Sequence, residues 1–443
     1  MLRGLALLCV GWSCVPPAQQ RAVRRPAGRA AVLGCASAPI SQLFDDLASF
    51  GGVESAVELR GVQGNAALVA KQRLAKGDTL LRVPRKLLLT AHRSGVVGGL
   101  MGQTDSMHDA AGDLRTEVGK ERFDAGETWD VRLALAVMEA TAGAGGPFWD
   151  GYRQLLPLPP HVSNAACLPV GFIPMLCDAV LEKQAHDTRA RLRKLYPTLH
   201  TLSAHPATGF YEQRFGEEAV GYIPSPLDWC HALVVSRCFS TVDEDTFAFT
   251  PFLDMANHAE TPTANFTTGP DGSMHLYALR DMSAGDEVTI CYDGGSYSSR
   301  RFFELYGFAP RDGSVHDVEL LLPKGMKVAA RRPADERMLA TLATQAQLDG
   351  VTAERIAAIS TACASASPAD NVASEEGGEI VLAHVKDALT RFDTSLEQDM
   401  QTVIELEAQA ADSGSRADPR VKAVLGYRVV VKRLLLLAKE LLS

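Results

Sequence analysis

Metal and disulfide patterns are scarce in this 443-residue sequence. Its nine cysteines are scattered, none forms a Cys-x-x-Cys pair, and no cluster of His and Cys has the spacing of a zinc site. These absences exclude the common structural zinc motifs. They predict reduced thiols in a reducing compartment and no structural metal.

Long apolar runs and positive charge are also lacking. No stretch beyond the N-terminal region approaches the roughly 18 to 20 apolar residues that span a bilayer, and the formal net charge is −9. The first 44 residues hold five arginines and neither Asp nor Glu, so the remainder carries −14. Because nucleic-acid binding needs a basic face, this acidity predicts a protein partner, with no nucleic acid and no membrane.

The first 44 residues combine a short apolar run behind Arg3, "LALLCVGWSCV", with an Arg- and Ala-rich stretch. The apolar run is too short to span a membrane and has the length of a signal-peptide core, and the stretch after it suggests an organelle transit peptide. We therefore expect a targeting segment over residues 1–44. A disordered arm is the alternative.

Hydrophobic patterning predicts two β regions separated by helices. Short apolar runs divided by Gly-containing turns indicate strands over residues 51–90 and again over 246–293. Between them, "WDVRLALAVMEA", "PMLCDAVLEKQAHDTRARLRKLY" and "LDWCHALVVSRCFS" have apolar residues at helical spacing. Neither β region alone has enough strands to bury a core. Both are therefore expected in one domain, residues 45–310, with a helical insert at about 129–235.

After Pro310 the sequence predicts a helical domain over residues 311–443. Its helical stretches are "RPADERMLATLATQAQL", "GEIVLAHVKDALTRFDTSLEQDMQTVIELEAQAA" and "DPRVKAVLGYRVVVKRLLLLAKELL". Two segments are expected to lack regular structure, a Gly- and charge-rich loop over residues 91–128 and a polar Ser/Ala linker at about 365–378.

The stretch "PFLDMANHAE", residues 251–260, places Asp254, Asn257 and His258 behind an apolar lead-in. By itself this pattern is compatible with a metal cluster, a phosphate-binding turn, an acid–base pair or an ordinary polar turn after a buried strand. One His and one Asp without further ligands make an incomplete metal shell, which disfavours the first interpretation.

Three segments in order carry a family resemblance: "GVQGNAALVAKQRLAKGDTLLRVP", then "VVSRCFS" with "PFLDMANH", then "AGDEVTICYDGGSYSSRRFFELYGF". Together they resemble the split SET domain of protein methyltransferases, most of all the subfamily of Rubisco large-subunit lysine methyltransferase. The likeness runs from about residue 50 through "FDTSLEQDM" and the last helix, with no Cys-rich segment after "YGF". It implies an α+β SET domain with short β-sheets and a pseudoknot-like core, a helical insert and an all-helical substrate-binding domain.

The resemblance implies S-adenosylmethionine as the cofactor. The positions that match the family's cofactor contacts are Gly64, Asn65, Ala66, Arg237, Asn257, His258 and Phe308. A guanidinium at Arg237 suits a carboxylate because it binds it bidentately; a helix-surface salt bridge is the alternative. Phe308 would stack on adenine or pack in the core. The family's contact at His258 is a main-chain one, which leaves unexplained why this residue is His.

Tyr292, in "EVTICYDGG", matches the family's catalytic tyrosine, whose hydroxyl orients the amine and the methyl group. The positions implied for the substrate lysine are Arg237, Phe239, Asp254, Tyr292 and Tyr306. A narrow apolar channel suits this task because it favours the neutral form of lysine, whose free pKa is about 10.4. Core packing of Tyr292 and Phe239, and turn capping by Asp254, are the alternatives.

The first cofactor loop departs from the family pattern. Relatives usually have Gly-x-Gly before "LVA" or "LRA", and here Ala67 stands where the second Gly would be. If that position needs a positive φ, Ala costs about 1 kcal/mol and shifts the loop. "SYSS" also departs from the usual Ser-Asn after the catalytic Tyr.

These motifs together predict a plastid protein-lysine N-methyltransferase. The Rubisco large subunit and fructose-bisphosphate aldolase are candidate acceptors by family analogy alone. Two alternatives stay open. One is a catalytically inactive SET-fold protein-binding module, motivated by Ala66 and Ala67. The other is a protein-histidine methyltransferase, disfavoured because relatives that methylate histidine have a polar residue in place of Phe239.

Overall fold

The computed structural model describes residues 40–62, 65–92, 128–195, 224–240, 246–292, 297, 299–310, 318–321, 327–330, 375–410 and 418–442. Most of the predicted targeting segment, most of the loop expected at 91–128 and the helix expected at "RPADERMLATLATQAQL" lie outside these residues. The linker expected at 365–378 is partly described, and there helix α12 has already begun at Glu375.

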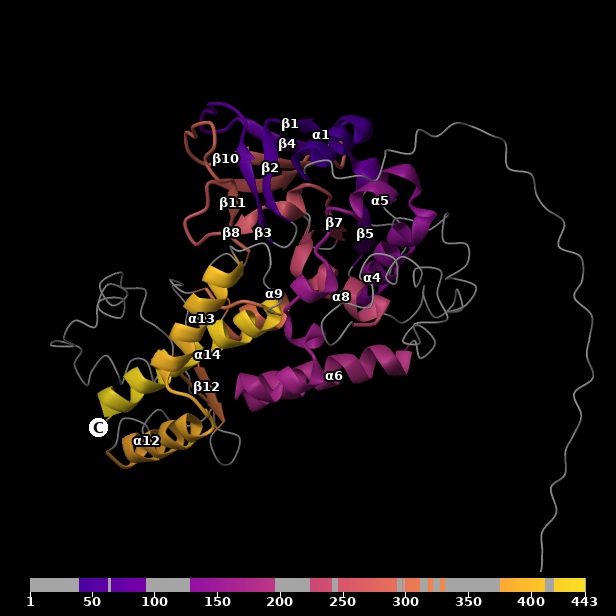
Figure 1. Cartoon of the computed structure of the whole chain (residues 1–443). Helices are drawn as coiled ribbons and strands as arrows, with labels where there is room; N and C mark the ends of the chain where they lie inside the picture. The colour runs from indigo at the N-terminus through magenta and orange to yellow at the C-terminus, as the bar shows by residue number, and fades with distance from the viewer. Residues whose placement is uncertain are drawn as a thin grey trace, which may run out of the picture. The chain divides into compact units, whose positions relative to one another are not determined.

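Strands and helices follow one another in blocks along the chain: strands before the insert, helices in it, strands after it, and mostly helices toward the C-terminus (Figure 1). The strands are β1 Glu54–Ser55, β2 Val57–Val62, β3 Asn65–Ala70, β4 Thr79–Val83, β5 Leu89–His92, β6 Cys238–Ser240, β7 Thr246–Phe249, β8 Asn257–His258, β9 Ala264–Thr268, β10 Met274–Ala278, β11 Thr289–Ile290, β12 Val318–Leu321 and β13 Lys327–Ala330. The helices are α1 Ile40–Gly51, α4 Trp129–Glu139, α5 Gly146–Tyr152, α6 Ala179–Leu195, α8 Pro226–Arg237, α9 Ser299–Tyr306, α12 Glu375–Thr390, α13 Leu396–Ala410 and α14 Pro419–Leu442.

The folded body begins before the boundary predicted at residue 44. Helix α1 starts at Ile40, and Phe44 on its inner face is fully buried, with its ring centroid 4.9 Å from that of Phe252. Burial of such a side chain contributes on the order of 2 to 3 kcal/mol. Residues 40–44 therefore belong to the folded body, and the extent of the targeting segment stays a prediction.

Strands from before and after the insert share one sheet. Its order is β1-β4-β10-β9, with every pair antiparallel, so that β4 lies beside β10 although the whole insert separates them in sequence (Figure 1). Alternate residues of β10, namely Met274, Leu276 and Ala278, are buried. This period of two is the pattern of a strand with one face on the core.

The three segments that carry the family resemblance meet at short strands. Strand β8 pairs in parallel with β11, Asn257 opposite Thr289 and His258 opposite Ile290. Strand β3 joins them through a bridge between Val69 and Glu287. This junction brings the NH motif beside the strand that ends just before Tyr292.

The C-terminal helices share a core with the insert and with α9. Buried residues of this second core are Leu176 and Leu181 from the insert, Phe303 from α9, and Val424 and Tyr427 from α14. The region also holds the antiparallel β12–β13 hairpin, which corrects the prediction of an all-helical domain. The reason lies in the two paired segments, Val318–Leu321 and Lys327–Ala330, which are short apolar runs, too brief for a helix and suited to strands.

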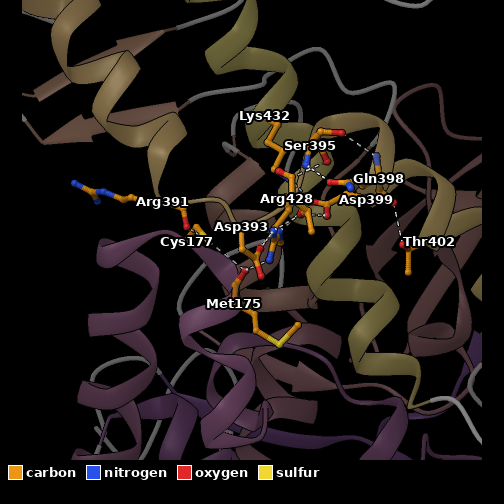
Figure 2. Close-up of polar contacts among 11 residues, drawn as sticks. Met175, Cys177, Arg391, Asp393, Ser395, Gln398, Asp399, Thr402, Arg428 and Lys432 are labelled. Atoms are coloured by element: carbon orange, nitrogen blue, oxygen red, sulfur yellow. Dashed lines mark hydrogen bonds and ion pairs between the residues drawn. The ribbon is translucent and has the colours of Figure 1, made fainter.

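Polar contacts fasten the C-terminal region to the insert, as Figure 2 shows. The carboxylate of Asp399, 1% exposed, accepts from Arg428 Nε at 3.0 Å and from Lys432 Nζ at 2.6 Å. Arg428 also donates to Asp393 at 2.5 Å and to the Met175 main-chain oxygen of the insert at 3.3 Å. The "FDTSLEQDM" motif thus supplies both anions of this joint, the buried Asp399 and the exposed Asp393.

Within the part of the chain that the structure describes, no helix has the length and apolar character needed to cross a membrane.

Candidate active site

Tyr292 lies two residues beyond β11, with its hydroxyl turned back to the preceding motif. The hydroxyl donates to the main-chain oxygen of Ala256 at 2.8 Å, and the ring centroid lies 4.8 Å from that of Tyr306. Burial raises the pKa of Tyr292 to about 12. The hydroxyl therefore stays protonated at neutral pH and acts as a hydrogen-bonding group rather than as a base.

A cavity of about 860 Å³ opens beside Tyr292. Phe239, Asp254, Phe266 and Tyr306 line it together with Tyr292. Phe239 is 8% exposed and packs edge-on against Phe266, with centroids 4.9 Å apart. Phe239 therefore packs in the core and also forms part of the cavity wall. Four of the five positions predicted for the substrate share this one cavity.

Arg237, the fifth position, lies behind Asp254 and is not among the residues that line the cavity. Its Nη1 donates to the Asp254 main-chain oxygen at 2.7 Å and lies 3.4 Å from the carboxylate. The Asp254 side chain is fully buried and also accepts from the Tyr152 hydroxyl. Burial, opposed by Arg237, raises the pKa of Asp254 to about 6. At neutral pH the carboxylate is therefore mostly ionised and balances the guanidinium.

The side chain of His258 holds the main chain at Tyr292. The Tyr292 N–H donates to His258 Nδ1 at 3.2 Å, and the imidazole lies 5.2 Å from the Tyr292 ring and 4.9 Å from the Phe302 ring. An acceptor nitrogen in a flat ring meets both demands, the hydrogen bond and the packing between aromatics. This answers why the second residue of the NH motif is His.

Asn257 connects the NH motif to the first cofactor loop. Its Nδ2 donates to Glu287 Oε1 at 2.9 Å and to the main-chain oxygen of Ala66 at 3.3 Å. Of the predicted loop residues, Gly64 lies outside the described residues, and Asn65 is the first residue of β3, opposite Val62.

The strain considered at Ala67 does not arise. Ala67 is an extended residue of β3, paired with Arg60, and among the described residues of β2 and β3 the positive φ falls at Gly61, at 109°. The Ala that departs from the family pattern therefore sits where any residue can adopt the backbone. The second departure, "SYSS", is only partly within the described residues.

Phe308 packs against the NH motif, and Gly307 before it allows the chain to approach the insert closely. The Phe308 centroid lies 6.2 Å from His258 and 5.7 Å from Phe302. Gly307 has a φ of +77°, and a Cβ there would lie 2.4 Å from the carbonyl carbon of Ser163 in the insert. Only Gly fits so close an approach. The insert thus presses directly on the "YGF" turn.

The predicted residues therefore form two groups. One group lines the cavity: Phe239, Asp254, Tyr292 and Tyr306. The residues of the other group do not line the cavity, but each contacts a residue of its wall or of the NH motif: Ala66, Arg237, Asn257, His258 and Phe308.

Sequence reasoning missed Tyr152 and Glu287, because a Tyr in an apolar helix and a Glu just before a strand resemble ordinary packing and surface residues. The partners of Tyr152 are distant in sequence: Asp254 is 102 residues away. Among the described residues, no group of three or more His, Cys, Asp or Glu could hold a metal ion.

The family profile described as SET domain matches residues 65–293, just over half of the chain. The chain belongs to the SET domain family. The match begins at β3 and ends one residue beyond Tyr292, so it covers the NH motif and, of the cavity wall, Phe239, Asp254 and Tyr292, but not Tyr306.

Curated SET-domain relatives are distant in sequence. The mouse (Mus musculus) SET domain-containing protein 4 is 25% identical over 299 residues, which cover 61% of this chain and 58% of that protein. Its human (Homo sapiens) counterpart is 26% identical over 185 residues, 38% of each. The chain thus spans less than two thirds of the length of the curated relatives it matches.

Solved structures share the SET fold over nearly the whole chain. The SET domain of LSMT bound to lysine and AdoHcy superposes with a TM-score of 0.57 at 16% identity, covering 92% of both chains. Rubisco LSMT bound to sinefungin and monomethyllysine gives 0.56 at 16% identity with the same coverage. At this identity the likeness establishes the fold alone: an α+β SET fold with helices in the C-terminal region.

Proposed function

We propose that this SET-domain protein is a protein-lysine N-methyltransferase that uses S-adenosylmethionine. The observation that carries the proposal is the setting of Tyr292, whose hydroxyl is held on the Ala256 carbonyl in a cavity walled by Phe239 and Tyr306. The solved LSMT structures of similar fold are described as bound to lysine with AdoHcy, and to AdoMet, which supports both halves of the proposal.

The residues outside the cavity lining fit this cofactor in their chemistry. Arg237 offers a guanidinium fixed by Asp254, suited to a carboxylate. Asn257 and Ala66 offer an amide and a main-chain carbonyl, and Phe308 offers an aromatic face. When bound, S-adenosylmethionine supplies an electrophilic methyl group on a sulfonium.

The cavity wall suits a lysine amine. In water the amine is mostly charged, because its pKa is about 10.4. The aromatic walls of Phe239, Phe266 and Tyr306 remove water from it and so favour the neutral, nucleophilic form. The protonated Tyr292 hydroxyl and the Ala256 carbonyl then orient the nitrogen, which lowers the entropic cost of an in-line displacement.

Phe239 supports lysine rather than histidine as the acceptor, since an apolar wall offers no partner to a second ring nitrogen.

We place the acceptor among plastid proteins, with the Rubisco large subunit and fructose-bisphosphate aldolase as first candidates. The acid-free, Arg-bearing first 44 residues motivate this localisation. A fluorescent protein fused behind residues 1–39 should enter the plastid; diffuse cytosolic or nuclear fluorescence would contradict it.

The activity test uses the purified protein with tritiated S-adenosylmethionine and each candidate acceptor, followed by mass spectrometry of the labelled peptide. The proposal expects label on a lysine, lost in the Tyr292→Phe variant. Label on histidine would overturn the choice of acceptor. Calorimetric binding of S-adenosylmethionine without transfer to any acceptor would favour the inactive binding module.

A further inference from the structure

The hydroxyl of Tyr152 lies where the helical insert meets the candidate site. Tyr152 ends helix α5, is fully buried, and packs its ring 5.3 Å from that of Phe252. Its hydroxyl donates to the carboxylate of Asp254 and accepts the main-chain N–H of Phe252 at 2.8 Å. One oxygen of the insert thus holds two points of the "PFLDMANH" motif.

Phe252, one of these two points, has an unusual backbone. Its φ is +70° and its ψ is −44°, a conformation that a bulky residue rarely adopts. Such a strained conformation persists only where the surroundings hold it. Here the Tyr152 hydroxyl holds the N–H, and Phe44 and Tyr152 enclose the ring.

The turn that follows Phe252 carries two parts of the site. Asp254 balances Arg237, and the Ala256 oxygen accepts the Tyr292 hydroxyl. We infer that Tyr152 is a positioning residue contributed by the insert: it fixes the Phe252 turn and, through the Ala256 carbonyl, the Tyr292 hydroxyl. The expected effect of Tyr152 on turnover rests on the proposed methyl transfer. Its expected effect on the position of the Tyr292 hydroxyl does not.

The first test reads the Tyr292 hydroxyl directly, by NMR of protein carrying ¹³C at tyrosine Cζ, with the Tyr292 signal assigned by its loss in Tyr292→Phe. Tyr152→Phe keeps the ring and removes only the hydroxyl. Tyr427→Phe is a matched control, because Tyr427 is also fully buried and donates to a buried carboxylate, Asp178, at 2.6 Å. The Tyr292 signal should move in the first variant and stay in place in the second. An unmoved signal in Tyr152→Phe overturns the inference.

The second test measures single-turnover methyl transfer to the acceptor identified above. Tyr152→Phe should slow transfer about 10- to 100-fold, since small misplacements of reacting groups have effects of this size. In a Tyr292→Phe background the same change should add much less, because both act through one hydroxyl. Fully additive slowing overturns the inference. If the parent protein transfers to no acceptor, the proposed function fails, while the NMR measurement still decides the role of Tyr152.

Discussion

Two buried carboxylates, Asp254 and Asp399, are held by cations in very different ways. Asp254 faces one guanidinium, that of Arg237, and lines the cavity; its pKa is raised to about 6. Asp399 accepts from two cations, Arg428 and Lys432, and does not line that cavity. Asp254 therefore has one positive charge beside it, at the cavity. Asp399 has two positive charges beside it, in the joint. Asp254 thus belongs to the wall of the cavity, whereas Asp399 ties helix α13 to helix α14.

The largest expected effect lies in the joint. Asp399→Ala removes the buried anion shared by Lys432 and Arg428, and Arg428 keeps the exposed carboxylate of Asp393. The change should lower the free energy of unfolding by about 3 to 5 kcal/mol in chemical denaturation. Asp387→Ala is the matched control in the same region, because Asp387 is exposed and pairs with Arg391 at 3.1 Å; it should cost at most about 1 kcal/mol. Equal losses in the two variants would remove the distinction.

The next effect lies in the cavity. Tyr292→Phe removes the hydroxyl held at Ala256 and keeps the ring, so methyl transfer should fall about 10² to 10³-fold. The unfolding free energy and the calorimetric affinity for S-adenosylmethionine should change little. Transfer at the parent rate would show that Tyr292 does not orient the amine.

A third measurement sharpens the comparison through pH. The folded-state pKa of Asp254, about 6, lies above its ordinary value of 3.8. Asp254 therefore stabilises the folded state most below about pH 4, where it is protonated in both states. This contribution falls between about pH 4 and 6 and is constant above that window. Over that window the unfolding free energy of the parent should drop by roughly 3 kcal/mol relative to Asp254→Asn. Parallel stability curves for the two proteins would contradict the raised pKa.

The smallest effect concerns His258. His258→Phe keeps a flat ring but removes the acceptor of the Tyr292 N–H, and should cost about 1 to 3 kcal/mol of stability. His275→Phe is the control, because the His275 ring has, among the described residues, one side-chain hydrogen bond, to the nearby Ser273 at 2.7 Å. This variant should cost less than 1 kcal/mol. If both variants unfold at the same denaturant concentration, His258 does not support the site through this bond.

Much of this protein could be predicted from local patterns. The order of strands, insert and helices followed from hydrophobic periods, which each element needs in order to bury one face. Tyr292, Asn257, His258 and Phe308 were found through motifs that keep their residues close in sequence. The tertiary structure places them around or behind one cavity wall.

Other features were decided only by contacts between distant segments. Local pattern gave no reason to assign residues 40–44 to the body, because Phe44 is buried by Phe252 across the whole insert. The extended backbone at Ala67 comes from pairing with Arg60, and the role of Tyr152 comes from a carboxylate 102 residues away. A sequence window records which residues are apolar or polar. The partner of each buried polar group is set by how the chain closes on itself, and that closure determined which tyrosines, histidines and aspartates belong to the site.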